Sequence, residues 1–158
     1  MVPRMLRAAP AVAVAVIALA LPALSQAAGM STPEASLLRQ MNVVRAQHGL
    51  APLRFDSHLQ LAARSHSREI VTAGVFQHGA FASRMVRFHI RGSIAGENLA
   101  WGTGVYGSAR GVVAAWLTSP EHRANLLRPS YRRVGVASLL ATFLGHRGAR
   151  VVTADFAG

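Results

Sequence analysis

The chain of 158 residues contains no cysteine and no lysine. Without cysteine it can form neither a disulfide framework nor a thiol nucleophile, so disulfide-stapled folds and cysteine-dependent enzymes are excluded. The fold must therefore be held by its hydrophobic core, which a domain of this length can supply.

Acidic residues are scarce as well, since six Asp and Glu stand against 17 arginines, for a formal net charge of +11. Such a balance suits an anionic partner such as nucleic acid, anionic lipid or an acidic wall polymer. In the part that follows the N-terminal segment, the arginines are spread from Arg39 to Arg150 in ones and twos, with no run and no interleaved aromatic patch. We therefore do not expect nucleic-acid binding, and a solvated basic surface that adsorbs weakly to envelope polymers is the simpler interpretation.

Long apolar runs are limited to Ala8–Leu24, which follows two arginines near the start of the chain. A positive start, an apolar stretch and then small residues over Ser25–Ala28 are typical of a secretory signal peptide. We expect residues 1–27 to be removed, or cleavage one residue later, leaving one domain over residues 28–158. The protein would then be secreted or periplasmic with no membrane span. A retained anchor is the alternative, because the run is near the lower length limit for crossing a bilayer.

Helical periodicity dominates the first two thirds of the chain. Apolar residues recur every three to four positions, hydroxyl or carboxylate caps precede several segments, and glycines follow the first two. The predicted helices cover residues 32–48, 57–73, 80–90 and 109–116. We expect a bend at Ser119–His122, because Pro120 cannot continue a helix comfortably, with a turn restarting over Arg123–Leu127.

From Val134 onward the pattern changes to short β-like runs. These runs are Val134–Leu140, Ala141–Leu144 and Ala149–Phe156, with a hairpin turn predicted at Gly145–Gly148. The Ile94–Trp101 segment is too rich in glycine and alanine to assign. Helices first and strands last predict an α+β fold, with an antiparallel sheet covered by helices.

Three polar side chains stand out against this apolar pattern. Glu97 lies in a small-residue stretch, His78 precedes it at the end of a loop, and His122 follows it after Pro120. If the fold brings them together, two neutral imidazoles could hold a divalent ion, while the carboxylate could ligate it, orient a histidine or hold a bound water. The structural alternative is that Glu97 accepts backbone N–H bonds and that Asn98 locks the turn.

Together these motifs resemble the CAP superfamily, the secreted domain of cysteine-rich secretory proteins, antigen 5 and pathogenesis-related proteins, in its cysteine-free bacterial SCP-like form. The resemblance covers about residues 37–157 and implies an α-β-α sandwich with a central cleft. The matching stretches, in family order, are Asn42–Leu50, Pro52–Asp56, Leu59–Ala63, Phe76–His78, Gly96–Ala100, Trp116–Leu127, Tyr131, Val134–Val136 and Asp155–Ala157.

The resemblance also implies a cleft of two histidines and two acids, in which His78, His122 and Glu97 take three places. In many members the second acid lies one helical turn after the tryptophan, and this chain has Ser119 there. Glu121, beyond the proline, is the candidate substitute. Some members bind metal in this cleft, others bind sterols, lipids or proteins, and the family has no single shared activity.

We therefore favour a secreted, monomeric, non-catalytic module that binds an envelope or extracellular ligand, such as a lipid or a protein. Its cleft would comprise His78, Glu97, Glu121 and His122. No cofactor is required, and zinc is the candidate metal for the two histidines. Trp116, Asn98 and Ser119 are expected to play structural roles beside the cleft.

Two alternatives remain open. One is a weak metal-dependent hydrolase or protease, with a metal-bound water attacking a carbonyl and Glu97 or Glu121 as general base. The chain has no His-Glu-x-x-His motif and no nucleophile that spacing identifies, which argues against it. The other alternative is a lipid or sterol carrier.

Overall fold

The computed structural model describes residues 29–158, so the predicted signal segment at residues 1–27 lies outside the described part. The helices are α1 (Thr32–Gln47), α2 (Ser57–Ala73), α3 (Phe81–Arg87), α4 (Ala109–Thr118) and α5 (Pro120–Leu126), with a 3-10 turn η2 (Gly104–Gly107). The strands are β1 (Arg54–Phe55), β2 (Ala95–Thr103), β3 (Arg133–Phe143) and β4 (His146–Ala157).

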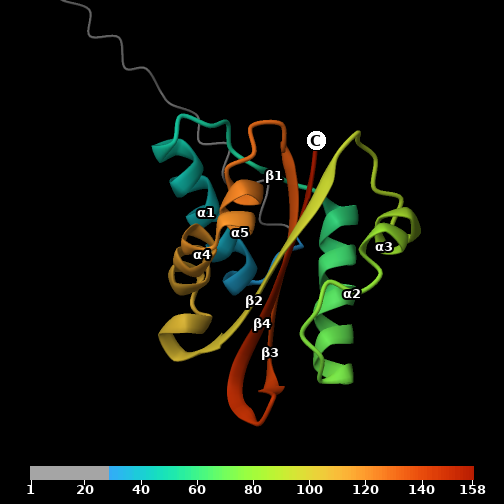
Figure 1. Ribbon diagram of the computed structural model, residues 1–158, viewed down its shortest axis with the longest axis vertical. Helices are drawn as coiled ribbons and strands as arrows, with labels where there is room; N and C mark the ends of the chain where they lie inside the picture. Colours follow the sequence, from blue (N-terminus) through green and yellow to red (C-terminus); the bar gives the residue numbers. More distant parts are fainter. Residues whose placement is uncertain (1–28) are drawn as a thin grey trace, which may run out of the picture.

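These elements form three layers (Figure 1). Helices α1, α4 and α5 cover one face of the sheet, and α2 with α3 covers the other. The predicted α-β-α sandwich is therefore confirmed. Within residues 29–158, every helix is too short or too polar to cross a bilayer.

The strand order is β1-β3-β4-β2, which places β4 inside the sheet and β2 at an edge. β4 is antiparallel to both neighbours, whereas the two-residue strand β1 runs parallel to β3. The sheet is thus mixed rather than wholly antiparallel as predicted.

The helix ends follow the local chemistry of the sequence. The Asp56 carboxylate accepts hydrogen bonds from the backbone N–H groups of His58 and Leu59 at 2.9 and 3.1 Å, so it caps α2 as predicted. Gly74 ends α2 in the left-handed conformation, with φ of 66°. At the start of α1 the Ser31 N–H donates to the Glu34 carboxylate at 2.7 Å, which is half of a capping box.

Two local predictions are wrong in part. The chain does bend at Ser119, whose backbone is extended, but the helix restarts at Pro120 rather than at Arg123, because Pro120 occupies the first helical position, where its missing N–H is harmless. The hairpin turn lies at Leu144–Gly145 rather than at Gly145–Gly148. Both turn residues have positive φ, 47° and 82°, which fits a two-residue type I′ turn and leaves β3 as one continuous strand.

The segment that the sequence left unassigned is the edge strand β2. Its side chains alternate between the two faces of the sheet, so Glu97 points toward α2 and Asn98 toward α5. Across the sheet Glu97 is paired with Asp155 of β4, and Asp155 is paired with Gly135 of β3. This strand register places the Glu97 and Asp155 side chains next to each other.

The position of α2 depends on Gly135. A Cβ built there would lie 2.0 Å from the backbone carbon of Leu59 and 2.1 Å from the nitrogen of Gln60. The absence of a side chain therefore lets α2 pack directly on the sheet, close to the buried carboxyl groups.

A buried arginine fixes α5. The Arg45 side chain of α1 is fully buried, and its guanidinium donates to the carbonyls of Leu126 at 2.9 Å and Tyr131 at 3.1 Å, together with two further carbonyls. These bonds hold the end of α5, and so the helix that carries His122, against the first layer.

Candidate functional site

Glu97 is the centre of a buried ionic cluster at the edge of the sheet. Its side chain is 2% exposed, and its Oε1 accepts a hydrogen bond from His78 Nδ1 at 2.7 Å. Its Oε2 forms an ion pair with the Arg84 guanidinium. Both carboxylate oxygens are therefore occupied by donors from the chain itself.

Arg84 is the principal residue that sequence reasoning missed. It lies on the short helix α3 with a side chain 4% exposed, and its guanidinium is aimed at the carboxylate from the α2 side of the sheet. In sequence it is one of three cations in a poorly capped segment, with no pattern that distinguishes it from Arg87 or Arg91. Only the tertiary fold reveals its role.

Asp155 is the second buried acid of the cluster. It is fully buried beside Glu97 on the adjacent strand, and as a carboxylate neither of its oxygens has a hydrogen-bond partner. Burial raises the pKa of Asp155 well above its ordinary value, and the charge of Glu97 raises this pKa further. This burial favours the protonated form of Asp155, in which the carboxyl group can donate a hydrogen bond to Glu97.

The protonation of Glu97 is balanced near neutrality. Burial raises the pKa of Glu97 to about 7, while the Arg84 guanidinium and the Asp155 hydrogen bond act in the opposite direction. A carboxyl group with a shifted pKa in a cluster of this kind is typical of functional sites, although structural ion pairs can produce the same shift.

His66 supports the cluster from α2. Its ring is 3% exposed, and Nε2 donates to the Gln77 carbonyl at 3.0 Å while lying 3.8 Å from Glu97 Oε2. Burial lowers the pKa of His66, and the nearby Arg84 charge lowers it further. His66 therefore stays neutral and fixes the loop that presents His78.

The backbone of His122 is tied to the strand that carries Glu97. The Asn98 amide donates to the His122 carbonyl at 2.9 Å, and the Asn125 amide donates to Asn98 Oδ1 at 3.0 Å, so β2 is tied to α5. Burial lowers the pKa of His122, and the neighbouring His78 lowers it further, against the opposing charge of Glu121. The half-buried His122 imidazole is therefore neutral at pH 7.

The remaining predicted residues lie around this cluster rather than in it. Glu121 is exposed in the first turn of α5, and the half-buried Ser119 precedes that helix. Trp116 is fully buried, and its Nε1 donates to the Leu99 carbonyl of β2 at 2.9 Å. The tryptophan thus holds the strand that carries Glu97.

The donor set for a metal ion is small. Among residues 29–158, no group of three or more His, Cys, Asp or Glu side chains is arranged to hold a metal. Because His78 Nδ1 contacts Glu97, only its Nε2 is left for a ligand, and zinc at His78 and His122 stays a prediction.

The chain belongs to the CAP, or cysteine-rich secretory protein, family, whose model matches residues 38–152. Among curated proteins it is similar to the uncharacterized membrane protein YlbC of Bacillus subtilis (strain 168), at 33% identity over 111 residues, covering 67% of this chain and 31% of the relative. It is also similar to the uncharacterized protein YkwD of the same strain, at 32% identity over 117 residues, covering 71% of this chain and 44% of the relative.

Among solved structures it is similar to an extracellular protein containing an SCP domain from Bacillus anthracis str. Ames. The identity is 25% and the TM-score 0.61, over 82% of this chain and 44% of that one. This chain thus spans less than half of each of these relatives, so the likeness concerns the shared domain.

Proposed function

We propose that this protein is a secreted CAP module that binds an extracellular or envelope ligand through the cleft of His78, Glu97 and His122, without catalysing a reaction. The predicted signal sequence and the extracellular protein among the similar structures support secretion. The Arg84–Glu97 ion pair is the observation that carries the binding role.

A general base needs a carboxylate that is free to take a proton from water. In this cluster His78 and Arg84 donate to the two Glu97 oxygens, and Asp155, whose pKa is raised by burial, lies beside them. This arrangement favours a carboxylate that positions His78 over one that performs chemistry. Glu121 remains exposed and outside the cluster, which makes it a poor substitute.

The cleft is better suited to binding a ligand than to catalysis. The His78 side chain is 58% exposed, and its contact with Glu97 fixes the tautomer, so its Nε2 can accept a hydrogen bond from a ligand. The neutral His122 ring beside it adds a second acceptor or donor. The oriented His78 imidazole and the neutral His122 ring suit a polar group of a ligand, and the two could also hold a weakly bound zinc ion.

The test uses immobilised protein exposed to fractionated medium and envelope extract, with retained molecules identified by mass spectrometry. We expect wild-type protein to retain a ligand that the His78→Ala/His122→Ala variant releases. The matched control is His48→Ala, an exposed histidine at the end of α1. Equal retention of the ligand by the His78→Ala/His122→Ala variant and by the His48→Ala control would contradict binding in the cleft.

Two further measurements separate the alternatives. If zinc binds, calorimetry shows a weak zinc interaction that the double histidine variant loses and His48→Ala keeps. Turnover of a peptide and ester panel that disappears in Glu97→Gln would replace the binding role with hydrolysis.

A further inference from the structure

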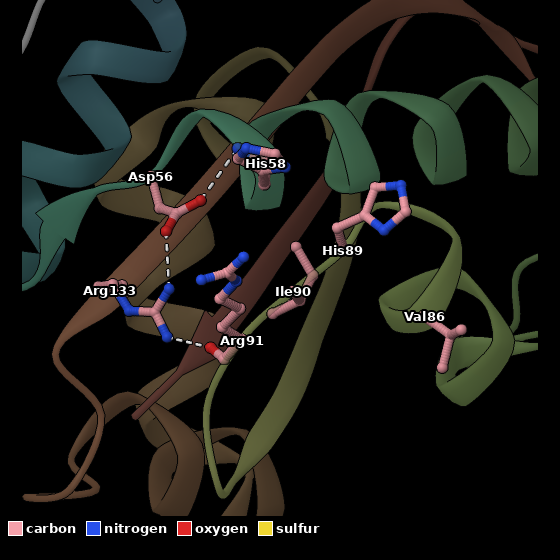
Figure 2. A pocket seen from close by; sticks show the side chains of 7 residues that line it. All are labelled: Asp56, His58, Val86, His89, Ile90, Arg91 and Arg133. Atoms are coloured by element: carbon pink, nitrogen blue, oxygen red, sulfur yellow. Dashed lines mark hydrogen bonds and ion pairs between the residues drawn. The ribbon is translucent and has the colours of Figure 1, made fainter.

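A second polar cavity lies between the start of α2, the end of α3 and the start of β3 (Figure 2). Its volume is about 780 Å³, and none of its lining residues belongs to the His78–Glu97–His122 cleft. The lining residues are Asp56, His58, Val86, His89, Ile90, Arg91 and Arg133.

Positive charge predominates in this cavity. Its sole acid among the lining residues, Asp56, uses Oδ1 to cap α2 and pairs through Oδ2 with Arg133 at 2.8 Å. Figure 2 shows the Arg91 guanidinium directed into the space between His58 and Ile90, and it has no ion pair or hydrogen bond among residues 29–158. One cation is therefore left without a counter-charge.

The backbone that follows Arg91 is held at two points. The Arg133 guanidinium donates to the Arg91 carbonyl, and the Ser93 N–H donates to the carbonyl of Gly158 at 3.2 Å. Between them Gly92 has φ of 143°, and a Cβ there would lie 2.3 Å from the Gly158 oxygen. Arg91 thus extends from a fixed segment, which lowers the ordering cost of binding.

Two histidines border the same space. His58 Nδ1 donates to the Phe88 carbonyl at 3.0 Å, which orients its ring. His89 follows α3 with φ of 55°, in the left-handed position where helices usually have glycine. The fold therefore presents an imidazole at a place where glycine would suit the backbone better.

We propose that this cavity binds a small organic anion, whose carboxylate or phosphate group pairs with Arg91 and whose apolar part lies against Ile90 and Val86. The planar guanidinium fork matches the two oxygens of a carboxylate or phosphate, and the partly exposed aliphatic side chains supply apolar contact. This site is separate from the cleft of the proposed function and does not depend on it.

The test is a titration of the ¹⁵N-labelled protein with phenyl phosphate, benzoate and inorganic phosphate, followed by amide chemical shifts at about 0.15 M salt. We expect saturable shifts in residues 56–58 and 86–91 with at least one organic probe. The organic probe that binds more tightly identifies the anionic group. Inorganic phosphate should bind more weakly because it lacks the apolar contact.

Three variants locate the binding. Arg91→Gln should lower the affinity about tenfold, the loss expected for one charge-assisted pair. Arg110→Gln, which alters an exposed arginine of α4, should leave it unchanged. His89→Gly should keep the fold, because glycine adopts the left-handed conformation readily, and should weaken binding.

The same spectra report whether each variant is folded, so a lost affinity can be separated from a lost fold. The proposal is overturned if neither organic probe saturates up to about 10 mM, since such binding would be no stronger than surface adsorption. It is also overturned if Arg91→Gln and Arg110→Gln bind with the same affinity.

Discussion

The two faces of β4 differ in chemistry, although their residues alternate along one strand. Val152, Ala154 and Phe156 lie in the apolar cluster beneath α1, α4 and α5. Thr153 and Asp155 face α2, where buried polar groups meet Glu97 and Arg84. A single strand thus separates a mostly apolar face from one that combines apolar residues, Val151 among them, with the candidate site.

The two faces contribute differently to the free energy of folding. Apolar burial on the first face is favourable at any pH, by roughly 25 cal/mol per Å². On the second face, desolvation of the carboxyl groups opposes folding, and a buried ion pair offsets this cost only in part. Keeping Glu97, Asp155 and Arg84 together therefore lowers stability relative to an apolar face, which is consistent with a functional role for that layer.

The largest expected effect lies on the apolar face. Trp116→Ala should lower the free energy of unfolding by about 4 kcal/mol, because it leaves a cavity and frees the Leu99 carbonyl. Urea unfolding at about pH 5 and about pH 8 should give the same loss, since the apolar contacts do not titrate. Trp116→Phe, which fills most of the space, should lose markedly less.

The next effect lies on the polar face and depends on pH. Arg84→Met should cost about 1.5 kcal/mol at about pH 8, because Arg84 stabilises the ionised form of Glu97, which predominates only above its pKa of about 7. At about pH 5 the cost should be close to zero. There Glu97 is protonated, and replacing a buried unpaired guanidinium with methionine relieves desolvation.

The direction of this pH dependence follows from the linkage between proton binding and folding. The pKa of Glu97 is raised by burial from 4.5 to about 7, so between these values the folded protein holds a proton that the unfolded chain has lost. The stability due to this group is complete below pH 4.5 and is lost as pH rises through 7. Because Arg84 opposes the rise in the pKa of Glu97, its removal extends the loss of stability to higher pH, and an equal cost at both pH values would contradict the coupling.

The apolar layer could be predicted from the sequence to a larger extent than the polar one. Caps such as Asp56 and Gly74 are local signals, and so is helical periodicity, which explains why the boundaries of α1 and α2 agree with the structure. The strand β2 was missed because Gly96, Ala100 and Gly102 dilute its alternation, and pairing with β4 decides its structure.

The cluster itself depends on long-range register. His78, Glu97 and His122 could be named from the sequence, but Asp155 joins them only because β4 pairs with β2 in one register. Arg84 joins through the docking of a seven-residue helix that has no strong local signal. The positions of Asp155 and Arg84 do not follow from spacing along the chain. The sequence therefore indicates a cleft but not the arginine that pairs with Glu97 inside it.

The smallest effect tests whether the polar face is held by paired hydrogen bonds. Ser67 Oγ of α2 and Thr153 Oγ1 of β4 form a buried hydrogen bond of 2.9 Å. Ser67→Ala and Thr153→Val should each cost about 1 kcal/mol, because each leaves the other hydroxyl buried without a partner. The double variant should cost less than the sum of the two, since both hydroxyls are then gone and the shape is nearly kept. Urea unfolding of all four proteins gives the coupling free energy, and strictly additive losses would mean that the two hydroxyls stabilise the fold independently.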